Sequence, residues 1–583
     1  VRVGGLADAV VYRFALETLD GAGNRSPLSN VVQAETGDVE GPEVITDLRV
    51  AETAPHTLTV EFTAPGDDGN EGRAMSYDLR YATVPLDSTN WASGNKVATP
   101  APQSAGTTER IRIRNLTPEQ AYFVSVTAKD DGGHESQLSN SADAVLPADT
   151  VPPAAITDLR VVRTGFGSVT LGWTAPGDDG QEYRAARYEG RYSPQMITLE
   201  TWDQAQPLYG VGIPQDTGTA EEQTFAALPE GALYFAIRAT DTVGNQGGLS
   251  NQPRATTTGA GRTWEVRVDG SGDAPTVQAA IDAASHGDRV LIYPGRYLEH
   301  INFKGKRIHV VSAEGPEVTI LDGNGEPGSV VTFTSGETRE SVLEGLTITG
   351  GRGTYLAEFD LVVGGGINCR GSSPSLLLNW IQDNSAGGSK RGYGGAANVV
   401  GIAGSPSIRP VFIGNTIRRN HATHNGGGLV IGNAWIEVTE CLFQNNTSGF
   451  DGGGIYIFYF GEGTVAVTAS AFRENVAGDH GGAIEAGQGM NTPLEIRNNL
   501  FIRNEAHGQD PPGGLGTGGA VSMRDWPSII INNTFVDNIG TGTGPGCTGG
   551  HVLVSTENPV EIRANIFVGA EGCGVPRVLR TLG

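Results

Sequence analysis

Acidic side chains with one neighbouring histidine are the residues of this sequence that could do chemistry. Asp451, Asp479 and Glu485 stand near corresponding places in neighbouring units of a repeat, and His480 follows Asp479 directly. Glycoside hydrolysis needs two carboxylates roughly 5 to 9.5 Å apart, a separation that strands stacked about 4.8 Å apart could provide. Any acidic repeat offers such pairs by chance, and His480 opens a glycine-rich unit, which favours a turn role. No catalytic residue is assigned on this pattern alone.

Two acidic pairs could contribute to calcium binding, namely Asp67 with Asp68 and Asp178 with Asp179. Each pair lies in a Thr-Ala-Pro-Gly-Asp-Asp-Gly string, at 63–69 and 174–180. Ca²⁺ takes about six to eight oxygen ligands, so each pair could supply part of a site. The same string forms a good turn without a metal. Calcium is therefore the one cofactor that the sequence suggests, and the turn is its alternative.

Four cysteines in 583 residues do not form a disulfide framework. Cys547 and Cys573 are separated by about one repeat, so stacked units could bring them together in a disulfide in an oxidising compartment. A pair of free thiols is the equal alternative. Cys369 falls on an inward position of the repeat and is expected to be a buried thiol.

The element that must position these residues is a repeat between 364 and 572. Each unit opens with two glycines and alternating aliphatic residues, and later carries Ile or Phe followed three residues on by Asn. Alternation over four to six residues predicts short strands, and a period of 26 to 36 residues predicts stacked units, so we expect a parallel β-helix. The units open at Gly365, Gly427, Gly453, Gly481, Gly518 and Gly549, and the Ile/Phe anchors are Ile381, Ile417, Phe443, Phe472, Phe501 and Phe535.

Side chains on the outward parity of this repeat form an apolar patch. The patch consists of Val430, Tyr456, Phe458 and Phe460. Contiguous exposed apolar surface often marks an interface. Its occupant could be another subunit or surface protein, a glycan stacked on the rings, or a loop of this chain such as 351–363.

The first 258 residues carry a different repeat of about 110 residues. Two full copies begin with Ile-Thr-Asp-Leu-Arg-Val at 45–50 and 156–161, and each contains short alternating strands. Such strands predict β-sandwiches at 39–148 and 149–258, with Phe62 and Trp173 at equivalent core positions. Residues 1–38 match only the last strands of a third copy, so we expect missing upstream sequence or a partner that completes this sandwich. We also expect both ends of the natural protein to lie outside this sequence.

Residues 259–583 are predicted to form the β-helix with a cap at its first coil. The segment 273–284 is the one clear helix, with Val277, Ala280 and Ile281 on one face. A solenoid needs such a cap over its open end. The fold class is therefore all-β: sandwiches followed by a parallel β-helix with an N-terminal capping helix.

These patterns resemble two known groups. The sandwich repeats resemble fibronectin type III modules of bacterial extracellular proteins. The Gly-Gly-Ala and Phe-x-x-Asn units resemble chlamydial polymorphic outer-membrane proteins and right-handed, pectate-lyase-like β-helices, and Gly295-x-Tyr297-x-Glu299 resembles the opening of pectin methylesterase-like β-helices. That resemblance implies a right-handed coil. It implies no activity, because the scaffold carries lyases, hydrolases, adhesins and structural proteins alike, and no complete catalytic set of these enzymes is found.

The net charge of −25 argues against binding to nucleic acid or to an anionic membrane. No apolar run is long enough to span a membrane. Two functions stay open: a secreted or cell-surface structural or adhesive protein, whose fibronectin-type spacers present a rigid β-helix that could self-associate, or an extracellular lyase or glycoside hydrolase acting on acidic polysaccharide. The missing catalytic sets favour the first. Convergent Asp, Glu and Arg on one sheet would favour the second.

Overall fold

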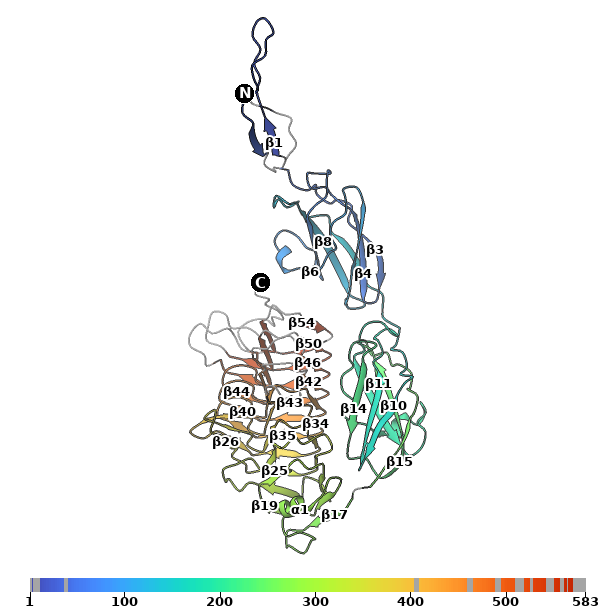
Figure 1. Ribbon diagram of the computed structural model, residues 1–583. Coiled ribbons are helices and arrows are strands. Elements are labelled where there is room, and N and C mark those ends of the chain that lie inside the picture. Colours follow the sequence, from blue (N-terminus) through green and yellow to red (C-terminus); the bar gives the residue numbers. More distant parts are fainter. Residues whose placement is uncertain are drawn as a thin grey trace. The chain divides into compact units, whose positions relative to one another are not determined.

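The computed structural model describes residues 3, 11–35, 40–259, 261–402, 408–458, 465–487, 494–508, 518–524, 528–541, 550–555, 560–563 and 565–569. The chain forms two compact units, Val1–Thr150 and Val151–Gly583, and each is described by itself. Almost every element is a strand, as expected for the all-β class (Figure 1). None of the helices in the described ranges has the length and apolar character needed to cross a membrane.

The first unit contains a hairpin and a β-sandwich. The sandwich packs the sheet β3-β4-β7 against the sheet β6-β5-β8-β9. In the strand that contains Phe62, Leu58, Val60 and Phe62 share one parity and line the core, and the Phe62 ring packs edge-on against Tyr77 at 5.1 Å. The strands are β1 (Val11–Phe14), β2 (Val32–Glu35), β3 (Arg49–Ala54), β4 (Thr57–Thr63), β5 (Ser76–Ala82), β6 (Asn95–Val97), β7 (Thr108–Ile113), β8 (Ala121–Lys129) and β9 (Ala142–Val145), with a 3₁₀ turn at Trp91–Ser93.

The second unit begins with a sandwich of the same design. Trp173 is fully buried and packs edge-on against Tyr188 at 5.5 Å, so it occupies the core place that Phe62 takes in the first sandwich. One sheet is β10-β11-β14 and the other is β13-β12-β15-β16. Their bounds are β10 (Arg160–Gly165), β11 (Ser168–Thr174), β12 (Arg187–Ser193), β13 (Gln206–Pro207), β14 (Ala220–Phe225), β15 (Gly231–Thr240) and β16 (Arg254–Thr257), with a 3₁₀ turn at Trp202–Gln204.

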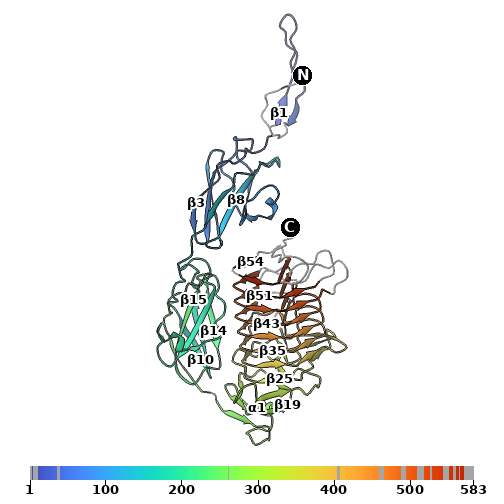
Figure 2. The ribbon, with the colours of Figure 1, turned by 180° about the vertical axis from the view of Figure 1, so that it is seen from behind.

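The rest of the second unit is a parallel β-helix, visible as stacked strands from both sides in Figures 1 and 2. Its longest sheet, called sheet A, runs β17 (Thr263–Val266), β18 (Arg289–Ile292), β21 (His309–Ser312), β24 (Val342–Glu344), β29 (Ser375–Leu377), β34 (Val411–Ile413), β38 (Ile436–Thr439), β42 (Val465–Thr468), β46 (Leu494–Arg497), β50 (Ser528–Ile531) and β54 (Val560–Arg563). Sheet B runs β19 (Gly295–Leu298), β22 (Thr319–Asp322), β25 (Thr347–Thr349), β30 (Trp380–Gln382), β35 (Thr416–Arg418), β39 (Leu442–Gln444), β43 (Ala471–Arg473), β47 (Leu500–Ile502), β51 (Thr534–Val536) and β55 (Ile566–Val568).

Two further sheets, C and D, add strands to the coils, and sheet D takes part only from β31 onward. Sheet C runs β20 (Ile301–Asn302), β23 (Val331–Phe333), β28 (Ile367–Arg370), β33 (Ala397–Val400), β37 (Leu429–Gly432), β41 (Ile455–Phe458), β45 (Ile484–Ala486), β49 (Val521–Arg524) and β53 (Val552–Ser555). Sheet D is short: β31 (Ser385–Ala386), β36 (His421–Ala422), β40 (Thr447–Ser448), β44 (Val476–Ala477), β48 (Glu505–Ala506) and β52 (Ile539–Gly540). A small side sheet holds β26 (Thr354–Leu356), β27 (Leu361–Val363) and β32 (Arg391–Tyr393).

The core of the β-helix is built from the aliphatic and aromatic residues that the repeat predicts. Ile455 and Ile457 have no exposed surface, in agreement with the expected inward parity, and Cys369 is buried in the same core. The Phe anchors stack along the axis with nearly parallel rings. Ring centroids are 4.7 Å apart for Phe443 and Phe472, and 5.0 Å apart for Phe472 and Phe501. One continuous core therefore runs through the coils.

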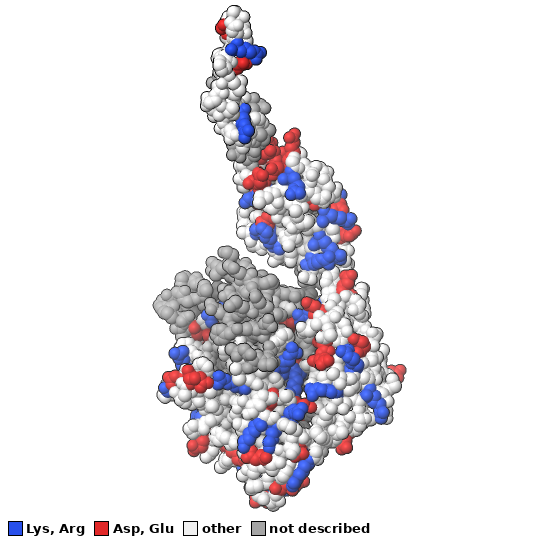
Figure 3. All heavy atoms as spheres, in the orientation of Figure 1, with Lys and Arg blue, Asp and Glu red and all other residues white. Residues whose placement is uncertain are grey.

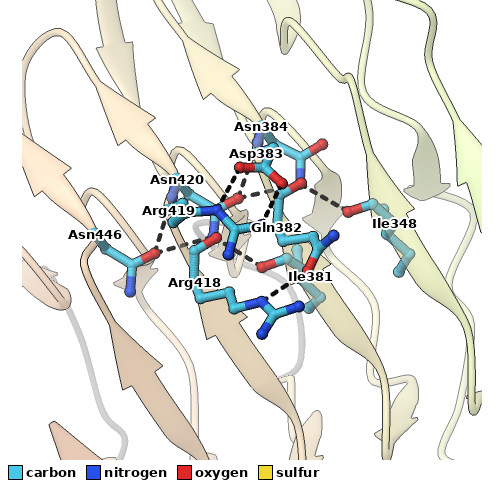
Figure 4. A network of polar contacts seen from close by, with 9 residues as sticks. All are labelled: Ile348, Ile381, Gln382, Asp383, Asn384, Arg418, Arg419, Asn420 and Asn446. Atoms are coloured by element: carbon cyan, nitrogen blue, oxygen red, sulfur yellow. Dashed lines mark hydrogen bonds and ion pairs between the residues drawn. The ribbon is translucent and has the colours of Figure 1, made fainter. Parts of the chain in front are cut away.

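Buried asparagines form ladders on either side of sheet B. One ladder joins Asn384, Asn420, Asn446, Asn475, Asn504 and Asn538. From Asn420 onward, each side-chain oxygen accepts from the backbone N–H and the amide of the asparagine one coil earlier. Figure 4 shows three of these rungs, with Arg419 bridging to Asp383 across coils at the surface. The ladders satisfy buried backbone groups that corners leave unpaired.

The cap is helix α1 (Val277–Ala283), shorter than the predicted segment but with the predicted buried face. Thr276 caps its N-terminus through a bond to Ala279 N–H. The carboxylate of Glu299 accepts from the backbone N–H groups of Val277 and Gln278, both at 2.9 Å. The Gly-x-Tyr-x-Glu string therefore fastens the cap to the first coils.

Within the second unit, the sandwich contacts sheet A of the β-helix. The hydroxyl of Ser168 donates to Glu340 at 2.9 Å, and Arg184 pairs with Glu495, whose side chain is fully buried. The sequence did not indicate these contacts. The predicted domain limits at 38, 148 and 258 stay predictions. The second sandwich and the β-helix belong to one compact unit.

Candidate functional site

The candidate site lies on the outward side of sheet C, at the turns that lead into β41 and β45. Asp451 and His480 occupy the same place in successive coils, since Gly452 N–H donates to the carbonyl of His480 at 2.9 Å. Each is followed by a glycine with positive φ, 65° at Gly452 and 63° at Gly481. This left-handed corner favours glycine, so the repeat itself fixes where the two side chains emerge.

His480 is held between two carboxylates. Its Nδ1 lies 3.1 Å from Oδ1 of Asp451 and 3.2 Å from Oδ2 of Asp479. The imidazole is only 6% exposed, and burial by itself lowers its pKa. The two carboxylates outweigh burial and raise the pKa of His480 to about 10. The imidazole is therefore a cation at neutral pH and cannot act there as a general base.

A second ion pair joins the next two strands of the sheet. Oε1 of Glu485 accepts from Nη2 of Arg524 at 2.9 Å, and the same Nη2 lies 3.9 Å from Oδ2 of Asp451. Glu485 has no exposed side-chain surface. Burial raises the pKa of Glu485 to about 7, although Arg524 opposes this, and the nearby Asp451 adds to it. Asp451 and Glu485 are thus the two carboxylates that converge on Arg524.

Aromatic rings border this cluster. Tyr456 projects from β41, and burial, with the carboxylates of Asp451 and Glu485, raises the pKa of its hydroxyl to about 12. Along the coil corner, His424 packs edge-on between two rings, 5.1 Å from Tyr393 and 4.4 Å from the half-exposed Phe450. The site therefore combines three carboxylates, two cations and aromatic rings on neighbouring coils.

This arrangement could serve two kinds of chemistry. Asp451 and Glu485 contact one nitrogen atom, so they lie inside the upper limit of about 9.5 Å for a glycosidase pair. Glu485 could hold a proton near neutral pH. Alternatively, Asp451, Asp479 and His480 each offer a ligand atom within 4.8 Å of the others, a spacing that suits a metal ion.

The sequence pattern indicated that these acidic residues could lie close together, a proximity that any acidic repeat could produce by chance. It gave no sign of Arg524. Asp451, Asp479, His480 and Glu485 do come together, as stacking of the units allowed. Arg524 lies 39 residues beyond Glu485 and meets it only through strand register. The predicted turn role of His480 also holds, since its carbonyl closes the corner at Gly452.

The role of the apolar patch as a surface that contacts a partner or a glycan stays a prediction. Val430, Tyr456 and Phe458 lie on sheet C with the predicted outward parity, and the Tyr456 and Phe458 rings stack at 6.1 Å. Val430 is only 1% exposed, so direct contact would fall mainly to the two half-buried rings. Phe460 lies outside the described residues.

The four aspartates predicted as calcium ligands lie in closed turns. Asp67 N–H donates to the Glu71 carbonyl at 2.7 Å, and Asp178 N–H donates to that of Glu182 at 2.7 Å. The Asp178 carboxylate accepts from Thr242 N–H and its hydroxyl. Asp68 and Asp179 share the same turns.

Their calcium role stays a prediction, as does the disulfide. Cys547 and Cys573 both lie outside the described residues.

Comparison with known proteins identifies one part of the chain. Residues 42–144 match the fibronectin type III domain. Calcium-activated chloride channel regulator 1 of Equus caballus is 31% identical over 150 residues, 24% of this chain and 16% of that protein. Chitinase A1 of Niallia circulans is 30% identical over 156 residues (26% and 20%), and endoglucanase B of Cellulomonas fimi is 28% identical over 185 residues (30% and 16%).

The chain thus spans a fifth or less of each of these relatives. Among solved structures, the chicken CNTN1 FN1–FN3 domains match 42% of this chain and 77% of that chain, at 16% identity and a TM-score of 0.16. Residues 42–144 are therefore a fibronectin type III domain, in a chain whose C-terminal part is a parallel β-helix.

Proposed function

We propose that this chain is an extracellular structural and adhesive protein in which fibronectin type III modules carry a rigid β-helix. The observation that carries the proposal is the continuous core of the β-helix, with its stacked phenylalanines and its buried asparagine ladders. Such a column resists bending because each coil is bonded to its neighbours through side chains as well as backbone. The combination of module and solenoid fits an extracellular structural role.

Surface chemistry supports adhesion to polar partners. Acidic and basic side chains are interspersed among the residues coloured in Figure 3, without an extended field of one sign on that face. The Tyr456 and Phe458 rings offer stacking surface on sheet C. In this proposal the second sandwich is part of the rigid body, since it contacts sheet A, and the module at 42–144 acts as the spacer.

The test compares binding with turnover. The purified chain is incubated with immobilised acidic and neutral polysaccharides and with whole bacterial cells, and both retention and released sugar ends are measured. The proposal predicts retention on at least one surface, weakened at least tenfold by replacing both rings (Tyr456→Ala with Phe458→Ala), and no shortening of any polysaccharide. The matched control is Tyr355→Ala, an exposed tyrosine on the side sheet.

A polysaccharide hydrolase is the second candidate, favoured by the convergence of Asp451 and Glu485 on Arg524. The printed names of two relatives, a chitinase and an endoglucanase, point to the same chemistry. Two converging carboxylates are the groups that glycoside hydrolysis uses. Burial lowers the pKa of His480 but the carboxylates beside it raise that pKa to about 10, so its imidazole is not available as the base of a lyase at neutral pH.

Release of reducing ends would establish this activity and overturn the adhesive proposal. Glu485→Gln and Asp451→Asn would then each have to abolish it. Asp383→Asn is the control that should leave it unchanged, because this exposed aspartate pairs with Arg419 at the corner that follows sheet B.

A further inference from the structure

We propose that Asp451, Asp479 and His480 bind a divalent transition-metal ion, with Zn²⁺ as the best fit. The proposal rests on the geometry of these three side chains and is independent of the adhesive function. It concerns different residues from the aspartates of the two Asp-Asp-Gly turns.

Two of the three distances between the donor atoms match a tetrahedral site, and the third is within 4.8 Å. Nδ1 of His480 lies 3.1 Å from Asp451 Oδ1 and 3.2 Å from Asp479 Oδ2. Ligands about 2.0–2.2 Å from a tetrahedral zinc stand about 3.3 Å from one another. An ion can therefore enter among the three donors with small shifts, and it replaces the Nδ1 proton, which leaves to solvent.

One buried carboxylate oxygen at this place lacks a partner. Among the described residues, Asp479 Oδ1 makes no hydrogen bond, although the Asp479 side chain is 90% buried. Unpaired buried carboxylate oxygens are costly, and a cation beside Asp479 removes that cost.

The surrounding residues already orient the ligands. Arg524 contacts Oδ2 of Asp451 and Oε1 of Glu485, which leaves Oδ1 of Asp451 directed to His480. Partners of this kind fix the orientation of metal ligands in known sites. The ligands also emerge from glycine corners that are bonded coil to coil, so the site is held in place before the metal arrives.

The donor set selects the class of metal. One imidazole nitrogen and two carboxylates suit Zn²⁺, or Mn²⁺ as the nearest competitor. Ca²⁺ prefers six or more oxygens, about twice the number of protein donors here. Three protein ligands leave a fourth position open for water, as in zinc sites that take part in catalysis.

The full chain, stripped with chelator and dialysed at pH 7.5, is titrated with Zn²⁺ and its metal content is measured by mass spectrometry. We expect the wild type to retain one more equivalent than His480→Gln, and Asp479→Asn to weaken that site at least tenfold. His421→Gln, an exposed histidine on sheet D, and Asp383→Asn are matched controls that should bind as the wild type does.

Cobalt(II) gives a second readout that needs no variant. The wild type should produce the intense visible absorption of a tetrahedral site, and Zn²⁺ should abolish it. Equal metal content and affinity in wild type and His480→Gln, or only the weak spectrum of octahedral cobalt, would overturn the proposal. Because neither measurement involves a polysaccharide, failure here is distinct from failure of the adhesive function.

Discussion

Replacing Asn446 with alanine tests the asparagine ladder at its centre. The side chain has no exposed surface and takes part in four ladder bonds. It donates to the Ile417 carbonyl at 2.8 Å and to Asn475 Oδ1 at 2.9 Å, and it accepts from the backbone and side chain of Asn420 at 3.1 and 3.0 Å. Asn446→Ala therefore leaves the backbone N–H of Asn420 and the carbonyl of Ile417 in the interior without these hydrogen-bond partners.

Each buried group left without a hydrogen bond costs about 1–3 kcal/mol, so the local loss of stability is about 2–6 kcal/mol. Hydrogen exchange measured on peptides that cover 415–425 and 441–450 should show it, because exchange reports the free energy of local opening. At the lower bound, protection falls about 30-fold. Thr447→Ala, which removes an exposed hydroxyl bonded to His421, is the control.

The reasoning is refuted if Asn446→Ala changes protection no more than Thr447→Ala does. Such a result would mean that water or backbone rearrangement replaces the ladder bonds. It would also remove the main support for a rigid column.

Three further changes probe other parts of the architecture. Phe472→Ala, in the ring stack, should cost about 3–5 kcal/mol in urea unfolding, and Phe472→Leu much less; equal costs would contradict the packing account. Gly452 and Gly388 both have positive φ, but a Cβ at Gly452 would lie 2.4 Å from the Ile455 carbonyl oxygen, whereas a Cβ at Gly388 would meet open space. Gly452→Ala should therefore lower the free energy of unfolding in urea clearly more than Gly388→Ala does. Asp158 accepts from Thr174 N–H and hydroxyl, and these bonds lower its pKa although burial opposes them. The contribution of this carboxylate to the free energy of unfolding is below about 1 kcal/mol because the group is exposed. This contribution is present above the unfolded pKa near 4 and is lost as pH falls through the lowered pKa of the folded state. The stability of Asp158→Ala should therefore differ from that of the wild type at pH 7 and converge with it in acid.

The sequence predicted the column because its signal is periodic. Alternation set the inward parity of Ile455 and Ile457, and the Ile/Phe anchors gave the coil length. The capping helix was also predictable from its apolar face, although its fastening by Glu299 was not. These features are local, and each is encoded within one or two units.

Features that depend on distant register were not predictable in the same way. Arg524 meets Glu485 only because strands from successive coils align, and no local pattern marks that pair. Val430 has the predicted outward parity yet is buried, because parity gives direction and says nothing of what covers a face. The contact of Arg184 with Glu495 joins two separately predicted parts of the chain, and composition gives no sign of it.

The measurement that tests the column most directly is a cysteine cross-link across neighbouring coils. Thr447 and Val476 are paired in register in sheet D, with half-buried side chains pointing outward. Parallel strands lie about 4.8 Å apart, within the usual Cα separation of a disulfide, about 4.4–6.8 Å. The double variant Thr447→Cys/Val476→Cys should oxidise readily, and peptide mass spectrometry should find that bond. Thr447→Cys/Glu505→Cys, two coils apart, should stay reduced; the reverse outcome, or no preference between the pairs, would contradict a single in-register stack.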